Sequence, residues 1–291
     1  MAQRMVKVAA TRRTTPLWLA KWRKVVPWAL LLIAAVISLW PMYWLFVTAL
    51  TPTLYAIKTP PDLFPIHGNF SNIQRLLTQA SDYWSWGENS IIIAVSVTVF
   101  HIFFDTLAGY AFAKKRFPGR NLLFWIIIGT MMVPTYVTLI PMYIVTQNLH
   151  LLDTLWAVIL PGLANVFGIF LMRQYIQTLP SELLDAARID GCGELRVFWY
   201  MILPLAKPAI GALAIFTFVR HWNDFFWPLI VLQSSSNYTL PVGVAGLQGE
   251  FATDYGILFA GAALAALPMI VFFLIFQRYF LTGVRMGAVK G

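Results

Sequence analysis

The sequence contains little cysteine and little charge. Its one cysteine, Cys192, cannot form a disulfide within the chain or build a multi-cysteine zinc site. Only 11% of the 291 residues are charged and 59% are hydrophobic, whereas about a quarter of the residues are charged in a typical soluble domain. These values exclude an ordinary water-soluble protein and indicate a chain whose main solvent is lipid.

Signatures of enzymatic chemistry are missing as well. The sequence has no G-x-x-x-x-G-K-[ST] phosphate-binding loop, so we do not expect this chain to hydrolyse ATP. It also has no metal-ligand cluster, nucleophile elbow or pair of catalytic carboxylates at helical spacing. We therefore expect no catalytic residue, no metal site and no cofactor on this chain.

Long apolar runs are what the sequence does contain. A helix needs roughly 20 apolar residues to cross a hydrocarbon layer about 30 Å thick, because lipid cannot hydrogen-bond to a bare backbone amide. We expect an all-α integral membrane protein with six transmembrane helices, forming a single domain over 1–291. The first run could be a cleaved signal peptide, but it is too long for the apolar part of one. The six runs lie at residues 25–50, 90–113, 121–145, 155–171, 208–232 and 256–277.

Prolines interrupt several of these runs. Proline lacks a backbone N–H and clashes with the preceding helical turn. We therefore expect Pro134, Pro141, Pro161 and Pro268 to bend their helices. Such bends suit a helical bundle that lines a cavity.

The net charge of +9 reflects 21 Lys and Arg against 12 Asp and Glu. Basic segments that border apolar runs remain in the cytoplasm. We therefore expect both termini to be cytoplasmic, which agrees with an even number of spans, and no nucleic-acid partner. All basic residues except Lys58, Arg75 and Arg220 fall in the N-terminus (1–24), the segment 114–120, the region from Arg173 through the loop at 178–207, or the tail (278–291).

The cytoplasmic loop at residues 178–207 is too patterned for a simple connector. Ser181 is expected to cap a helix whose first turns carry acidic residues, and Gly191 is expected to end it. A second amphipathic stretch follows and ends at Pro204. The pattern predicts a short helix, a sharp turn and a second helix on the cytoplasmic surface.

Small residues mark one side of the first of these helices. Ala187 and Gly191 are four apart and are expected to share a face, with Ala186 adjacent, so that another protein can approach the backbone closely. The alternative is a helix that lies on lipid headgroups. Because anionic lipid repels the acidic residues mixed into this face, we favour docking by a protein.

The same loop resembles a known motif. Asp185-Ala-Ala187, three residues, Gly191, nine residues and then Met201-Ile-Leu-Pro204 is similar to the Glu-Ala-Ala motif of binding-protein-dependent ABC importer permeases. Asp185 stands where the family usually has Glu and Met201 where it usually has Ile, and both keep the chemistry. Residues 110–119, Trp222-Asn223 with Pro228-Leu229, and 287–291 look like the carbohydrate (maltose-type) branch, in its subunit with a short N-terminus.

The resemblance implies a type I ABC importer permease fold with a cytoplasmic coupling helix, in a bacterial or archaeal inner membrane. The implied partners are a dimer of ATPase subunits, which would bind ATP and Mg, a second permease subunit, an extracytoplasmic solute-binding protein and membrane lipid. The implied solute is a sugar or a sugar-like compound, with polyols, sugar phosphates and sulfonates left open.

The resemblance also implies which residues meet the ATPases. The coupling loop contributes the motif residues and their polar neighbours, and the tail is a second contact. The coupling residues would be Glu182, Asp185, Ala186, Ala187, Arg188, Asp190, Gly191 and Pro204, and the tail residues would be Gly287, Lys290 and Gly291.

Two pairs of ionisable residues lie within the apolar runs. His101 and Asp105 are four apart, as are Arg220 and Asp224, so each pair is expected to share a helical face. Buried charges in lipid are costly unless they are paired or wet. They could line the solute path, together with Trp222 and Asn223, or they could pair within or between helices and so fix the packing, and we favour pairing.

A proton-coupled secondary transporter is the alternative function. His101 and Asp105 could form a proton relay within the membrane. That function requires no ATPase partner and leaves the paired cytoplasmic helices unexplained.

Overall fold

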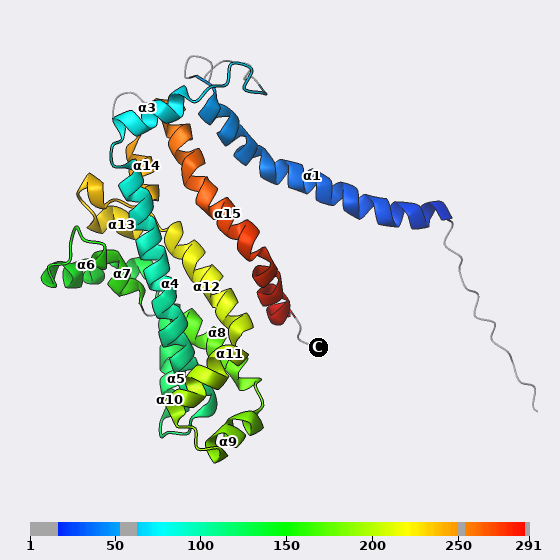
Figure 1. The fold of residues 1–291 in the computed structure, drawn as a ribbon, viewed down its shortest axis with the longest axis vertical. Helices are drawn as coiled ribbons and strands as arrows, with labels where there is room; N and C mark the ends of the chain where they lie inside the picture. The colour runs from blue at the N-terminus through cyan, green and yellow to red at the C-terminus, as the bar shows by residue number, and fades with distance from the viewer. Residues whose placement is uncertain (1–16, 53–62, 164, 249–253, 289–291) are drawn as a thin grey trace, which may run out of the picture.

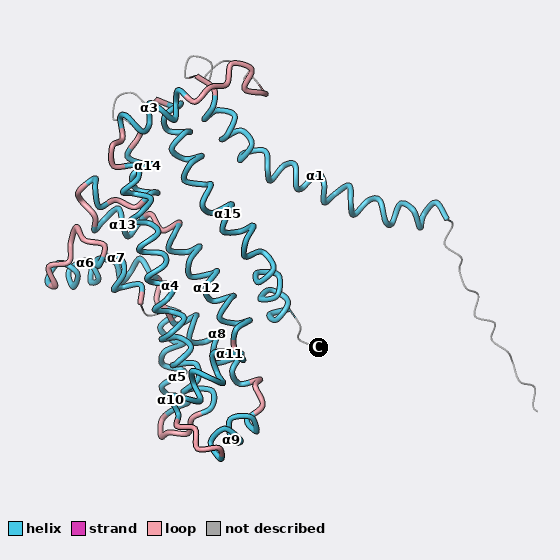
Figure 2. The backbone as a smooth tube through the Cα atoms, viewed as in Figure 1, coloured by secondary structure: helices cyan, strands magenta, loops and turns pink. Residues whose placement is uncertain are grey.

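The computed structural model describes residues 17–52, 63–163, 165–248 and 254–288. Within these ranges every regular element is a helix (Figures 1 and 2). In the described part of the chain, three helices are long and apolar enough to cross a membrane: α1 (Leu17–Leu50) from Val25 onwards, α4 (Tyr83–Lys114) and the part of α15 (Tyr255–Ala288) that ends at Gln277. Three bent helix pairs raise the number of spans to as many as six, as the apolar runs predicted.

Helix α4 is the centre of the bundle. It packs against α8 (Val166–Gln177) and α12 (Lys207–Trp222). The contact with α8 is close because of Gly109: a Cβ built there would lie 2.6 Å from Met172 Cβ and 2.9 Å from the Arg173 backbone nitrogen. Helix α4 begins at Tyr83 rather than at the predicted Ser90.

The third span is broken, which corrects the prediction of one helix over 121–145. It divides into α5 (Arg120–Gly129) with the 3₁₀ turn η1 (Thr130–Met132), and the 3₁₀ turn η2 (Thr135–Thr138) with α6 (Leu139–Asn148). The two halves are bent by 93°. Pro134 explains the break, because it disfavours helical backbone in the residue before it, and Val133 is extended at φ −78°, ψ 118°.

The fourth and fifth spans are broken too. Helix α7 (Trp156–Gly162) is bent by 40° from α8. The predicted fifth helix over 208–232 ends at Trp222, and a separate helix α13 (Phe226–Val231) follows. Arg220 and Asp224 therefore do not share a helical face, because Asp224 lies beyond the end of α12.

Breaks in the helices accompany only two of the four prolines. Pro134 and Pro161 lie at or next to breaks, whereas Pro141 lies inside α6 and Pro268 inside the continuous helix α15. A proline removes one hydrogen bond, and a helix can remain continuous around that loss.

The end of the bundle opposite α9 carries α3 (Ser71–Gln79), the turn η4 (Ser235–Asn237) and α14 (Leu240–Gly246) (Figure 1). Asn72 is buried and donates hydrogen bonds to the Ala49 and Thr51 carbonyls, 3.2 and 2.7 Å away, which fixes α3 to the end of α1. Trp86 Nε1 donates to the Ser235 carbonyl at 2.7 Å and so fixes η4 to α4.

Asp153 organises the neighbouring loop, with φ +59°. Its carboxylate accepts hydrogen bonds from the backbone N–H groups of Gln233 and Ser234, both at 2.9 Å, and from the Ser234 hydroxyl. Partial burial raises the pKa of Asp153, but the bonds from Ser234, Gln233 and Asn237 outweigh that effect and lower the pKa to about 2.

Replacing Asp153 with Asn should loosen the loop at 233–237. Because the folded pKa lies below the unfolded value, the carboxylate contributes stability above about pH 4 and loses it as the pH falls towards 2. Hydrogen exchange of the 233–237 amides should be faster in Asp153→Asn than in the parent at pH 7. Glu88→Gln, an exposed change on α4, is the matched control, and equal exchange in the two variants would contradict the role of Asp153.

The remaining helices form the opposite end, where α9 (Ser181–Ile189) lies farthest from α3 (Figure 1). After α9 come α10 (Glu194–Val197), a π-helical turn η3 (Phe198–Ile202) and α11 (Leu203–Leu205). The segment from Glu194 to Leu205 is bent by 78° from α12. The predicted helix, turn and second helix are therefore present.

Candidate functional site: the helical loop at residues 178–207

Helix α9 begins after Pro180. Pro180 occupies the N-cap position with φ −58° and ψ 129°, and Ser181 is the first helical residue. The prediction that Ser181 caps the helix is wrong, because its hydroxyl accepts a hydrogen bond from Lys114 Nζ at 3.2 Å. The same ammonium group donates to the Leu179 carbonyl at 2.5 Å, which ties the start of α9 to the end of α4.

One face of α9 packs against the protein itself. Leu184 and Ala187 are 1% and 9% exposed and belong to a core cluster with Val197 and Phe198 of the second helix. We expected Ala187 and Gly191 to share an outward face. Ala187 instead points inward, because the chain after Gly191 folds back beneath α9.

The opposite face of α9 is free. Leu183 is 43% exposed and Ile189 is 86% exposed, with Ala186 between them. At 3.6 residues per turn, these three positions lie on one side of the helix together with two acidic residues that flank them. We call this set the outward stripe, and it consists of Glu182, Leu183, Ala186, Ile189 and Asp190, all exposed.

Gly191 ends α9 with φ +83°. Its N–H donates to the Arg188 carbonyl and the Cys192 N–H donates to the Ala187 carbonyl, both at 3.0 Å. No atom lies within 4 Å of a Cβ built at this position. The glycine is therefore required by the left-handed backbone, which costs another residue roughly 1 kcal/mol or more.

Glu194 joins three parts of the end of the bundle that carries α9. Its carboxylate accepts a hydrogen bond from the Tyr110 hydroxyl at 2.8 Å and pairs with Lys115, both at the end of α4. It also lies 3.3 Å from Arg188 Nε, and Arg188 Nη1 donates to Asp185 at 2.7 Å. The Lys115 ammonium holds the pKa of the Glu194 carboxyl below its usual value.

Replacing Glu194 with Gln should loosen the connection between α9 and α4. Each exposed ion pair contributes about 1 kcal/mol or less, so we expect local loosening with the fold retained. Amide hydrogen exchange across α9 should become several-fold faster. Glu182→Gln removes a carboxylate from the outward stripe and should leave exchange unchanged, and the same increase in both variants would argue against the Glu194 connection.

The second helix of the loop changes direction at its end. The π-helical turn at Phe198–Ile202 precedes exposed Pro204, and the Ala206 N–H donates to the Ile202 carbonyl at 2.8 Å. The π-helical turn and Pro204 both disturb regular α-helical hydrogen bonding, as expected where a surface helix leads into a span. Pro204 thus lies at the bend and away from the outward stripe.

His101 and Asp105 meet within the membrane bundle. Asp105 Oδ2 lies 2.7 Å from His101 Nδ1, and His101 Nε2 lies 2.5 Å from the Gly162 carbonyl. The two side chains are 0% and 2% exposed, so they line no surface. Gly168 makes room for them, because a Cβ there would meet Asp105. His101 and Asp105 therefore pair within α4, and His101 links α4 to α7 by satisfying the carbonyl freed where α7 ends.

The other intramembrane candidates are distributed around the end of α12. Trp222 is buried and stacks on Phe218 with ring centroids 5.8 Å apart, whereas Asn223 is exposed and donates to the Val219 carbonyl at 2.8 Å. Arg220 is exposed and lines a polar pocket that does not include Trp222 or Asn223. The structure does not bring these residues together with His101 and Asp105 in one site.

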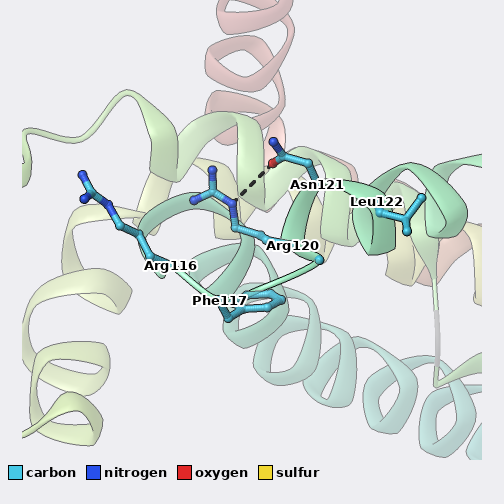
Figure 3. A pocket seen from close by; sticks show the side chains of 6 residues that line it. Arg116, Phe117, Arg120, Asn121 and Leu122 are labelled. Atoms are coloured by element: carbon cyan, nitrogen blue, oxygen red, sulfur yellow. Dashed lines mark hydrogen bonds between the residues drawn. The ribbon is translucent and has the colours of Figure 1, made fainter.

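A pocket of about 390 Å³ lies at the junction of α4 and α5 (Figure 3), and α5 and α9 lie at the same end of the bundle (Figure 1). Arg120 Nη1 donates to the Lys115 carbonyl at 2.8 Å, and its Nε bonds to Asn121 (Figure 3). Arg116 points away from this pair. These arginines gather at the end of α4, where the charge pattern predicts the cytoplasmic surface.

Sequence reasoning missed Tyr110, Lys115 and Glu194. The sequence did contain a signal for them, because the basic end of the second span and the acidic loop were both predicted on the cytoplasmic side. The pairing of Glu194 with Tyr110 and Lys115 depends, however, on tertiary contacts. Among the tail residues, Gly287 lies in the last turn of α15, and Lys290 and Gly291 fall outside the described residues.

Comparison with known proteins places the chain in a family. Residues 105–286 match the model of the "Binding-protein-dependent transport system inner membrane component" family. The chain is 39% identical over 259 residues to the arabinooligosaccharides transport system permease protein AraQ of Bacillus subtilis (strain 168), covering 88% of this chain and 92% of that protein. It is 34% identical over 261 residues to the sn-glycerol-3-phosphate transport system permease protein UgpE of Yersinia pestis, covering 87% and 93%.

A solved structure supports the same family. The chain superposes on a chain of a bacterial ABC transporter involved in the import of the acidic polysaccharide alginate, with a TM-score of 0.81 and 25% identity over 89% of this chain and 97% of that chain. The resemblance stated from the loop motif is thereby confirmed, and this chain belongs to the family of inner membrane components of binding-protein-dependent transport systems.

Proposed function

We propose that this chain is one permease subunit of an ATP-driven importer for a sugar or sugar-like solute. The observation that carries the proposal is the outward stripe of α9, an exposed surface held firmly at the cytoplasmic end of the bundle. The named relatives transport arabinooligosaccharides, glycerol 3-phosphate and alginate, which supports a sugar or another hydroxylated solute.

The stripe is suited to a groove on a separate ATPase subunit. Ile189 and Leu183 supply apolar surface and Ala186 lets the partner approach the helix backbone. Beneath them, Leu184 and Ala187 transmit force into the core that contains α4, and Glu194 fixes α9 to the same helix. A movement of the ATPase would therefore move the spans and not just the loop.

Glu182 and Asp190 belong to the stripe itself, whereas Asp185, Arg188, Gly191 and Pro204 have supporting roles in this proposal. Arg188 pairs with Asp185 beside the stripe, Gly191 sets the turn and Pro204 the bend. Because the chain has no phosphate-binding loop, ATP and Mg would bind to the ATPase dimer. The tail residues Gly287, Lys290 and Gly291 would form a second contact with that dimer.

A second permease subunit is proposed to cover α1. Residues along α1 from Trp28 to Trp40 are largely exposed, whereas its last turns pack on α15 (Figure 1). An apolar cavity of about 660 Å³ lies between α1, α12, α14 and α15, and Trp222 and Asn223 line it. Lipid alone could cover these surfaces, but a paired subunit would also enclose a solute path.

The orientation follows from the charges. Lys114, Lys115, Arg116 and Arg120 lie at the α9 end of the bundle, so this end and both termini are proposed to be cytoplasmic. The opposite end, with α3, η4 and α14, would then receive solute from the extracytoplasmic binding protein. All of 1–291 would act as one transmembrane domain.

The proton-coupled alternative is less well supported. A relay needs groups that exchange protons with water, but the side chains of His101 and Asp105 are sealed between helices and bonded to each other and to Gly162. We therefore retain the ATP-driven importer as the proposed function.

Uptake into proteoliposomes tests the proposal. The chain is purified with its partner subunits, and uptake of arabinooligosaccharides, alginate oligosaccharides and glycerol 3-phosphate is measured with ATP inside and with the binding protein outside. We expect uptake to require both. Uptake driven by a proton gradient without ATP would refute the importer and support the secondary transporter.

A further inference from the structure

A polar pocket of about 310 Å³ lies where two spans are broken. It is bounded by η1 and η2 at the break of the third span, by the break between α7 and α8, and by the end of α12. Thr130, Thr135 and Asn165 line it together with Arg220 and His221. Irregular backbone at membrane depth is tolerated where it lines a cavity, and discontinuous helices of this kind often hold solute.

Two basic side chains face this pocket. Arg220 is exposed, and among the described residues its guanidinium has no hydrogen bond or ion pair within 4 Å. His221 Nδ1 is buried and likewise has no hydrogen-bond partner within the described part of the chain. Its ring stacks on that of His101 at 6.2 Å, which fixes its position at the back of the pocket.

The start of α8 adds a positive electrostatic potential. Asn165 caps this 12-residue helix by accepting a hydrogen bond from the Phe167 N–H at 3.0 Å. Both Asn165 and Val166 line the pocket, so the positive end of the helix dipole lies at its wall. A cation and a helix N-terminus therefore converge on one space, and the His221 side chain forms part of its wall.

The two nearby carboxylates, Asp105 and Asp224, are not among the residues that line the pocket. Asp105 is occupied by His101 and shielded from the pocket. Asp224 is close enough to Arg220 to interact through space, but its carboxylate also faces the backbone N–H groups of Phe225 and Trp227 and it is not among the lining residues. The residues that line the pocket carry no acidic group.

The depth of the pocket indicates what fills it. His101, which contacts His221, lies roughly 20 Å along α4 from Lys114 at the cytoplasmic end, at about 1.5 Å per residue. The phosphate of a membrane lipid lies at the surface, outside a hydrocarbon core about 30 Å thick. A lipid headgroup therefore does not reach this level, whereas a solute in transit does.

We propose that this pocket binds an anionic oxygen group, a carboxylate or a phosphate, on the transported solute. The inference rests on the proposed importer function and narrows its solute to sugars or polyols that carry such a group. Arg220 makes the direct contact, and His221 and the start of α8 complete the site.

Protection of an introduced cysteine tests the proposal without the binding protein. Thr135→Cys is made in a Cys192→Ser background, in the complete importer reconstituted into proteoliposomes. A thiol-reactive methanethiosulfonate is applied with D-glucuronate, glucose 6-phosphate or glucose at tens of millimolar. We expect at least threefold slower labelling with one of the anions and no change with glucose. Arg220→Gln should remove the protection, and Arg116→Gln, an exposed arginine outside the pocket, should retain it.

The outcomes separate this inference from the importer function. Equal protection by glucose, protection that survives in Arg220→Gln, or no protection by either anion would overturn the anionic site. Uptake that still requires ATP in the same preparation would show that the importer function stands. Labelling is also compared between neutral and anionic vesicles without solute. Slower labelling in the anionic vesicles would assign the site to a lipid headgroup and overturn the inference.

Discussion

Replacing Ile189 with Asp should reduce ATP-dependent uptake at least tenfold while the chain remains inserted and folded. Ile189 is 86% exposed and makes little contribution to the chain's own core, so the folded bundle tolerates the change. Burial of such a side chain against a partner contributes about 1.5–3 kcal/mol. A carboxylate beside Asp190 removes that gain and adds a charge that the interface must desolvate. Uptake and co-purification of the ATPase subunits measure the effect.

Leu195→Asp is the matched control. Leu195 is 72% exposed on α10, on the other side of Gly191, and it lies outside the outward stripe. We expect this variant to retain the ATPase subunits. An equal loss in the two variants, or normal uptake in Ile189→Asp, would contradict docking by the stripe. Gly191→Trp is a poorer test, because the left-handed backbone at Gly191 makes any substitution strained.

Replacing Gly109 with Leu should prevent α4 and α8 from packing. A Cβ alone at Gly109 would lie 2.9 Å from the Arg173 backbone nitrogen, and a backbone atom cannot rotate away as a side chain can. Overpacking of this kind costs about 1–3 kcal/mol or more. We expect a lower yield of folded protein and a fall in Tm of several degrees, measured by thermal unfolding of the complete complex.

Gly129→Leu is the corresponding control within the membrane. Gly129 ends α5, and no atom lies within 4 Å of a Cβ built there. The folded yield and Tm of this variant should match those of the parent. A similar loss in both glycine variants would show that the cost arises from leucine in a span and not from the contact between α4 and α8.

Much of the fold follows from local sequence. Apolar runs identify α1, α4 and α15, because the requirement for a span depends on length and composition. The breaks in the third, fourth and fifth spans were predicted poorly. Pro134 and Pro268 have the same local chemistry, yet one lies at a break and the other inside a helix. The difference depends on what packs around each proline.

The candidate site was predicted in its position and only partly in its geometry. The motif located α9 and the turn at Gly191. The sequence could not tell which face of α9 is outward, since both Ala186 and Ala187 are small. The second helix covers Ala187 and leaves Ala186 free, and that choice is made by contacts with Val197 and Phe198.

The sequence by itself determined the solvent, the number of apolar runs, the expected orientation and the family motif, because each depends on composition, run length or spacing along the chain. Only the tertiary structure decided that Glu194 joins α9 to α4, that His101 and Asp105 are sealed together, and that Arg220 and His221 face one pocket. Each depends on residues far apart in the chain, because Glu194 meets Tyr110, His101 meets Gly162, and the pocket at Arg220 includes Thr135. Their contacts depend on how helices pack, which no local pattern specifies.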